Sequence, residues 1–175
     1  MMSKARKIIL TLLGLTFLSL ISAHKTLPAV ARESNILLIT IDTLRWDRLS
    51  ICCNNYVRTP YIDELARKST TFLNAYTHNP LTRPSHTNML TGLSPLYHGI
   101  SDNPGFRLDE RYLTLAEYLK KFGFRTAAFI GAFVLDSRFG LDQGFDVYND
   151  SMDEQEIFQL DFVERKAEEV IKPAM

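Results

Sequence analysis

The sequence predicts an α/β fold in which strands alternate with helices, giving a mostly parallel sheet flanked by helices. Two apolar stretches, over residues 35–41 and 124–130, have the composition of buried strands, and amphipathic helical patterns lie between and after them. The 175 residues are 46% hydrophobic and 23% charged, which is ordinary for a globular domain with a buried core. No internal repeat or low-complexity linker interrupts them, so the sequence predicts one domain.

The first predicted strand ends at a carboxylate. Residues 35–41, NILLITI, form a continuous apolar and β-branched run, which suits a central strand buried on both faces. Asp42 follows directly, at what would be the carboxyl end of that strand. Ligands of open α/β sheets bind at this edge, so Asp42 is the first candidate functional residue.

The other predicted elements continue the alternation. Thr59 and Pro60 are typical of a helix start, as an N-cap followed by proline at the first helical position. Thr114-x-x-Glu117 is a capping box, and Gly123 ends the helix that it opens. The remaining expectations are short strands over 71–76 and 124–130, a glycine-punctuated loop over 140–146 and a final helix from Ser151.

Charge and cysteine content argue against two classes of protein. Twenty basic side chains balance twenty acidic ones, so no electrostatic footprint for nucleic acid is present. Cys52 and Cys53 are adjacent and have no other partner, and no cysteine or histidine spacing resembles a zinc site. We therefore expect neither nucleic-acid binding nor a disulfide framework, and we interpret the two cysteines as small apolar side chains.

The N-terminus resembles a secretory leader. The first seven residues carry three basic side chains, and an uncharged apolar run of 14 residues follows from Ile8 to Ile21. Ala29-Val30-Ala31 offers a small-x-small cleavage site. The alternative is an uncleaved anchor that tethers the chain to a membrane through residues 8–21. Either way we expect export, periplasmic or secreted, with residues 1–31 as leader or anchor and residues 32–175 as the domain.

A threonine at a predicted helix start is the second candidate functional residue. Residues 80–92 read PLTRPSHTNMLTG, in which Pro84 suits a first helical turn and Gly92 a helix end. Thr82 would lie just ahead of the helix, where free N–H groups and the helix dipole favour an anion. A divalent cation held by Asp42 against the same oxygen would make the hydroxyl nucleophilic. The alternative is an ordinary helix cap.

Four stretches resemble, in the same order, the N-terminal part of the sulfatase-like family of the alkaline phosphatase superfamily. They are NILLITIDTLRWDRLS, TPYIDELARKSTTFLNAYTHNPLTRPSHTNMLTGLSPLYHGI, TLAEYLKKFGFRTAAFIGAF and FGLDQGFDVYND, and they cover nearly all of residues 35–150. The resemblance implies an alkaline phosphatase-like, three-layer α/β fold. It also implies a divalent metal, calcium or zinc or manganese, and an anionic ester as substrate.

The resemblance implies roles for individual residues. Asp42 takes the position of the aspartate that binds the active-site metal, and Thr82 takes that of the nucleophile, which also contacts the metal. Arg83 and His86 are candidates for holding the oxyanion or the leaving group. His86 would act as a general acid or as a neutral hydrogen-bonding side chain, whereas the alternative for Arg83 is a side chain that faces solvent. His98 matches the family's His-Gly pair, with contacts that the sequence does not show.

Departures from the family pattern point away from true sulfatase chemistry. Sulfatases oxidise a cysteine or serine to an aldehyde, which the branched Thr82 cannot form. His86 replaces the arginine of the family motif, and Thr43 stands where many sulfatases have a second aspartate. Residues 131–134 replace a block whose lysine grips the sulfate. The sequence therefore predicts phosphate-ester chemistry, of the phosphodiesterase or transferase type, in preference to sulfate-ester hydrolysis.

The later Asp, Asn and His ligands of the superfamily are absent from this chain, because no histidine follows Asp150. The acidic residues beyond that point have the spacing of a solvated surface. The sequence thus predicts a truncated catalytic domain, incomplete at its C-terminus and inactive and poorly soluble alone. The alternative is a non-catalytic remnant or binding protein that retains part of the fold.

Overall fold

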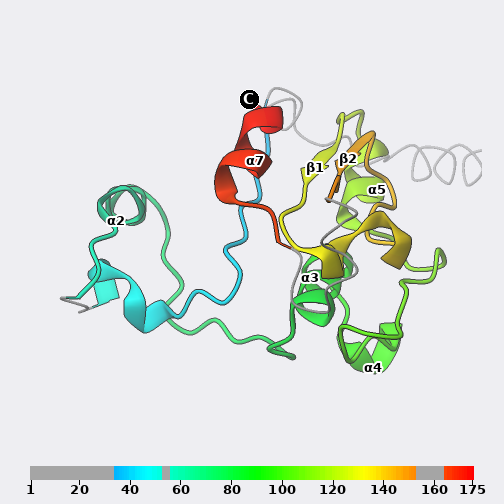
Figure 1. Cartoon of the computed structure of the whole chain (residues 1–175), viewed down its shortest axis with the longest axis horizontal. Coiled ribbons are helices and arrows are strands. Elements are labelled where there is room, and N and C mark those ends of the chain that lie inside the picture. The colour runs from blue at the N-terminus through cyan, green and yellow to red at the C-terminus, as the bar shows by residue number, and fades with distance from the viewer. Residues whose placement is uncertain (1–33, 53–55, 153–163) are drawn as a thin grey trace, which may run out of the picture. The chain divides into compact units, whose positions relative to one another are not determined.

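The computed structural model describes residues 34–52, 56–152 and 164–175 (Figure 1). The chain divides into two units, one up to Thr40 and one from Ile41 onward, and each is described by itself. Within the first unit, residues 34–40 are extended and belong to no helix or strand. The second unit contains all the elements named below.

The expected leader over residues 1–31 lies outside the described residues. Its cleavage, the membrane tether through residues 8–21 and the boundary at residue 32 therefore stay predictions. Within the described ranges, no helix combines the length and the apolar content that crossing a membrane requires.

Two of the predicted strands are wrong. Residues 35–41 and 71–76 form no strand, and their apolar side chains are exposed, with Leu37 at 82% and Leu73 at 85%. A strand exists only where a neighbour completes its ladder of hydrogen bonds. No such neighbour lies beside either stretch among the described residues. High β-propensity alone therefore leaves these stretches as extended chain.

The strand predicted over 124–130 is confirmed in a shorter form. β1 (Ala127–Phe129) pairs with β2 (Val147–Asn149), and Ala127 lies opposite Val147. The pair is parallel, as the alternation of elements predicts, and forms the sheet of the described residues. The connection between the strands carries two short 3₁₀ helices, η4 (Phe133–Leu135) and η5 (Ser137–Phe139).

Two helices begin at the residues that the sequence predicts, Pro60 and Leu115. The described α-helices are α2 (Pro60–Arg67), α3 (Thr82–Thr91), α4 (Pro95–His98), α5 (Leu115–Lys120) and α7 (Ala167–Ile171). Further 3₁₀ turns are η2 (Trp46–Arg48), η3 (Ser50–Cys52) and η6 (Lys172–Ala174). Gly92 ends α3 in the left-handed conformation, at φ +69°, as its position predicts. Most of the helix predicted from Ser151 falls on residues 153–163, outside the described part; where it is described, residues 151–152 and 164–166 are not helical, and the helix begins only at Ala167.

Thr59 occupies the predicted N-cap position of α2 without capping the backbone through its side chain. Its hydroxyl donates instead to Asp63 Oδ1 at 2.9 Å, and the Ser50 hydroxyl donates to Asp63 Oδ2 at 2.6 Å. These hydrogen bonds, that of Ser50 first, lower the pKa of the Asp63 carboxyl. The carboxylate thus ties η3 to the first turn of α2.

The core of the second unit lies where α3 packs beside η4. Its buried apolar side chains are Ile100, Leu108, Leu135 and Leu141. Several polar side chains are buried with them, among them Arg83, Thr87, His98 and Thr114. Tyr148 donates its hydroxyl to the Leu135 carbonyl oxygen at 2.6 Å, and burial raises its pKa. Each polar group of this core named here therefore has a hydrogen-bond partner.

The capping box of α5 is confirmed and also joins two parts of the chain. Thr114 Oγ1 accepts from Glu117 N at 3.2 Å, and Glu117 Oε2 accepts from Thr114 N at 2.8 Å. The Thr114 hydroxyl also donates to the Gln143 carbonyl oxygen at 2.8 Å. Next to it, a Cβ on Gly144 would lie 2.4 Å from Glu117 N, so only glycine fits this close approach. The loop over 140–146 is thereby held against the start of α5.

Replacing Thr114 with alanine should destabilise the protein. The Thr114→Ala variant loses a cap and leaves the Gln143 carbonyl without its donor, for a cost of about 1–3 kcal/mol in the free energy of unfolding. Thr114→Ser keeps the hydroxyl and should lose much less. Urea unfolding followed by circular dichroism measures both, with Thr70→Ala at an exposed position as the matched control. Equal stability of Thr114→Ala and Thr70→Ala would contradict this account.

Candidate functional site

Asp42 and Thr82 lie together in the structure, although 40 residues separate them. The Thr82 hydroxyl donates toward the Asp42 carboxylate, with Oγ1 at 3.1 Å from Oδ2 and 3.4 Å from Oδ1. Thr82 is the first residue of α3 instead of lying just ahead of it, because the helix begins earlier than predicted, and Leu81 is the N-cap. This hydroxyl and this carboxylate therefore lie within hydrogen-bond distance, but Asp42 follows no strand, so its predicted position at the edge of a sheet is wrong. Their roles as nucleophile and metal ligand stay predictions.

The backbone beside Asp42 is strained. Thr43 has φ +53°, a left-handed conformation that is an outlier for a β-branched residue. Its N–H donates to Asp42 Oδ1 at 2.9 Å. Such strain is concentrated at functional sites, where the surrounding structure maintains it. Here it accompanies the orientation of the carboxylate toward Thr82.

The start of α3 offers fewer free N–H groups than the sequence suggests. The Arg83 N–H donates to Asn103 Oδ1 at 2.9 Å, and Pro84 has no N–H. The Leu81 N–H donates to Asn79 Oδ1 at 2.8 Å. Among the first three helical residues this leaves the amide of Thr82 itself for an anion. The anion site expected from the helix terminus is therefore small, because side chains already satisfy its donors.

Arg83 occupies a place that neither sequence interpretation anticipates. The side chain does not face solvent, since the residue is only 1% exposed. Its Nε donates to the Val134 carbonyl oxygen at 2.8 Å and its Nη1 to that of Phe106 at 2.9 Å. The guanidinium carbon also lies 3.4 Å from the centre of the Phe139 ring. The cation therefore points into the interior, where it binds two carbonyl oxygens and an aromatic ring of the protein.

His86 lies one helical turn after Thr82 and bonds to its backbone. Nδ1 is 2.7 Å from the Thr82 carbonyl oxygen. Because a carbonyl only accepts, Nδ1 carries the proton of this hydrogen bond. This geometry agrees with the hydrogen-bonding role that the sequence allows. The general-acid role stays a prediction.

His98, whose contacts the sequence leaves open, is a buried side chain between α3 and α4. Nδ1 accepts from the Ile100 N–H at 3.1 Å, and Nε2 lies 2.7 Å from the side-chain amide of Asn88. The residue is 6% exposed, and this burial lowers the pKa of the imidazole. His98 therefore serves the packing of the two helices as a neutral side chain.

The donors at Asp42 and Thr82 fit part of a metal site. A carboxylate and a hydroxyl are hard oxygen ligands of the kind that calcium and magnesium prefer. Within the described ranges, no group of three or more His, Cys, Asp or Glu side chains is arranged to hold a metal. Calcium takes about six to eight oxygen ligands, so these two side chains would supply only a fraction of a coordination shell.

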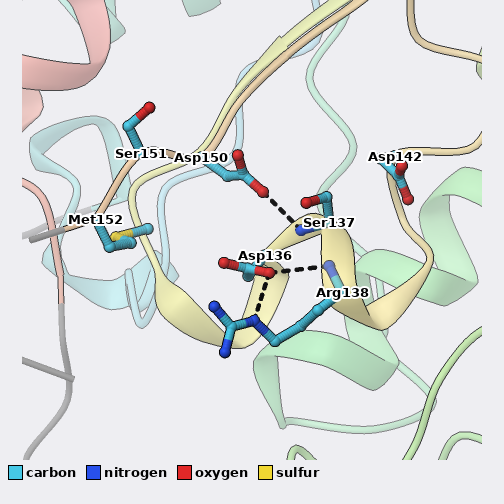
Figure 2. Close-up of a pocket in the computed structure, with 7 residues that line it drawn as sticks. All are labelled: Asp136, Ser137, Arg138, Asp142, Asp150, Ser151 and Met152. Atoms are coloured by element: carbon cyan, nitrogen blue, oxygen red, sulfur yellow. Dashed lines mark hydrogen bonds and ion pairs between the residues drawn. The ribbon is translucent and has the colours of Figure 1, made fainter. Parts of the chain in front are cut away.

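A polar pocket of about 600 Å³ lies elsewhere, beside η5 and the end of β2 (Figure 2). Its lining residues are Asp136, Ser137, Arg138, Asp142, Asp150, Ser151 and Met152. Asp136 Oδ1 accepts from Arg138 Nε at 2.7 Å, and Asp150 Oδ2 accepts from Ser137 N at 2.7 Å. These carboxylates therefore bind their own neighbours in the fold. The pocket includes neither Asp42 nor Thr82.

The chain belongs to the sulfatase family, whose model matches residues 34–161. It is 32% identical to an N-acetylglucosamine-6-O-sulfatase of Bacteroides thetaiotaomicron over 136 residues, which are 77% of this chain and 23% of that protein. It is 34% identical to an arylsulfatase of Clostridium perfringens over 97 residues, which are 54% of this chain and 20% of that protein.

A solved structure agrees with this assignment. It shows a protein in complex with its substrate D-glucosamine-2-N,6-O-disulfate, at a TM-score of 0.52 and 31% identity over 61% of this chain and 20% of that one. The expected alkaline phosphatase-like α/β fold is thus confirmed, and the described elements form part of it. The chain spans about a fifth of the length of the relatives that it matches. The relatives named here are sulfatases, so the preference for phosphodiesters receives no support.

Acid should weaken the fold through His98. Because burial lowers its folded-state pKa, the unfolded chain binds the proton more readily, and stability is lost as the pH falls below the unfolded value of about 6.5. Urea unfolding at a series of pH values from neutral downward should show this loss. His98→Asn should flatten the profile, whereas the matched control His78→Asn, in an exposed loop, should leave it unchanged. An unchanged profile in His98→Asn would show that other groups titrate.

Proposed function

We propose that this chain is the N-terminal part of a sulfatase-family hydrolase that cleaves anionic esters, sulfate esters first, with Thr82 as nucleophile. The observation that supports the proposal is the approach of the Thr82 hydroxyl to the Asp42 carboxylate at 3.1 Å. Family membership supplies the reaction class, and the named relatives supply the preference for sulfate.

The geometry supports a direct attack by the hydroxyl. Thr82 Oγ1 would attack the sulfur of the ester while its proton passes toward Asp42, and the bond from sulfur to the alcohol oxygen would break. The displaced alcohol takes up a proton, and water then releases sulfate from the threonine. This route needs no aldehyde, so it is compatible with the methyl group on the Thr82 Cβ.

A divalent cation belongs to the proposal, with Asp42 and Thr82 as two of its ligands. Such an ion would withdraw charge from the ester oxygens and favour the ionised hydroxyl. The residues of this chain hold and orient the attacking oxygen. Asn103 and the strained turn at Thr43 fix the backbone on either side of the pair.

The site lacks the usual sulfate-gripping lysine, and Arg83 does not replace it. Residues 131–134 carry no cation, and the Arg83 guanidinium is committed to the Val134 and Phe106 carbonyls. The amide of Thr82 and the side chain of His86 are polar groups of α3 that lie beside the hydroxyl. We therefore expect this site to bind the substrate anion weakly.

A chimera tests the function, because the matched regions are only 20% and 23% of the two relatives. Residues 34–161 of this chain would replace the matching region of the Bacteroides thetaiotaomicron relative. With calcium, we expect release of 4-nitrophenol from 4-nitrophenyl sulfate. Thr82→Ala should lower the rate by about 10²-fold or more, whereas Thr82→Ser should stay within about 10-fold.

The matched control for this assay is Thr70→Ala, which removes another threonine hydroxyl at an exposed position and should leave the rate unchanged. Turnover of an aryl phosphodiester in preference to the sulfate would support the phosphate-ester specificity expected from the sequence. Turnover that survives in Thr82→Ala would reject Thr82 as the nucleophile.

A non-catalytic remnant or binding protein is the second candidate. It is favoured by the finding that the described residues hold no group of three metal-ligating side chains. We expect the full chain, residues 1–175, to show no metal-dependent turnover of aryl sulfates, phosphomonoesters or phosphodiesters with zinc, manganese or calcium. Turnover by this chain alone that disappears in Thr82→Ala would reject this expectation.

Export is also part of the proposal, supported by the basic start and the apolar run from Ile8 to Ile21. N-terminal sequencing of the mature protein distinguishes cleavage after Ala31 from an uncleaved anchor. A cytoplasmic product with an intact N-terminus would contradict export.

A further inference from the structure

Arg83 carries a buried positive charge, and packing alone does not explain why a charge is placed there. The cation is buried, and among the described residues no carboxylate lies within ion-pair distance of it. Burial lowers its pKa, against the weaker raising effects of Asp102 and Asp136. A buried charge is costly, and an apolar side chain of similar volume is often as stable. Its presence next to Thr82 therefore calls for another explanation.

The contacts of Arg83 hold the first turn of α3 from separate directions. Nε binds the carbonyl of Val134 in η4, and Nη1 binds that of Phe106 in the loop before α5. The backbone N–H of the same residue binds the Asn103 side chain. Three directed hydrogen bonds to three points of the chain restrict rotation of the helix about its axis, which a single contact does not do.

Such a rotation matters at the distance observed for Thr82. Helix Cα atoms lie about 2.3 Å from the axis and side-chain oxygens further out, so a rotation of roughly 20° displaces the hydroxyl by about 1 Å. The hydroxyl lies 3.1 Å from Asp42 Oδ2, and a further 1 Å would break the hydrogen bond.

We propose that Arg83 and Asn103 are positioning residues that set the rotation of α3 and thereby hold the Thr82 hydroxyl against Asp42. This inference rests on the proposed function for its catalytic meaning, but the contact itself is measurable without turnover. Neither residue touches the reacting atoms. The planar guanidinium fork is the essential feature, because lysine offers the charge without two donors in fixed directions.

The test follows the Thr82 methyl signal by NMR in the full chain with isotopically labelled threonine, assigned with Thr82→Ser. Asp42→Asn should shift this signal, and that shift reports the contact. In Arg83→Lys and in Asn103→Ala the response to Asp42→Asn should fall by about twofold or more. In Asn103→Asp, which keeps an acceptor oxygen, and in the exposed control Arg125→Ala, it should be unchanged.

The buried hydroxyls of Thr114 and Thr126 distinguish positioning from general support of the fold. Their signals should stay unchanged in Arg83→Lys and Asn103→Ala. A full Thr82 response in both variants, or no response to Asp42→Asn in the unaltered chain, would overturn the proposal. So would Thr114 and Thr126 signals that move together with Thr82 in both variants, since that pattern indicates general support of the fold instead of positioning. Because Asn103 is only half-buried, its variant remains informative if Arg83→Lys fails to fold.

The same spectra separate this inference from the proposed function. An inactive chimera with an intact Thr82 response would reject the hydrolase and leave the positioning role standing. If the chimera is active and Arg83→Lys changes neither its rate nor the Thr82 response, the hydrolase is supported and the positioning role is rejected.

Discussion

The first turn of α3 depends on a buried guanidinium that has exchanged water for two carbonyl oxygens and an aromatic face. Arg83 reaches Val134 and Phe106, which belong to segments far from it in the sequence, and its ring partner Phe139 belongs to a third. A buried cation left without these acceptors would be very unfavourable, so the surrounding segments and the helix keep their relative positions together. The placement of Thr82 follows from that constraint.

The candidate site combines this rigid helix start with a strained turn. On one side, α3 presents Thr82 at its first position, where its hydroxyl faces another segment instead of capping its own helix. On the other side, Thr43 in a left-handed conformation turns the chain immediately after Asp42. Neither side chain is deeply buried, which suits a pair of oxygen ligands open to a cation and an anionic ester.

Local signals in the sequence are accurate wherever short-range chemistry decides the structure. The capping box at Thr114, the proline start of α2 and the left-handed Gly92 each satisfy their own turn, so a few residues suffice to predict them. The strand patterns are less reliable because a strand takes its hydrogen bonds from a neighbour. Residues 124–130 find one in β2, whereas residues 35–41 and 71–76 find none among the described elements.

By itself, the sequence determined the α/β class, the starts of α2 and α5, the family and the pair Asp42 and Thr82, since all of these depend on residue types at fixed spacings. The tertiary structure alone decided that Arg83 points inward, that His98 is a buried packing residue and that Asn103 accepts the Arg83 N–H from a loop. Each of these depends on which distant backbone atom meets a side chain, and spacing along the chain carries no record of that.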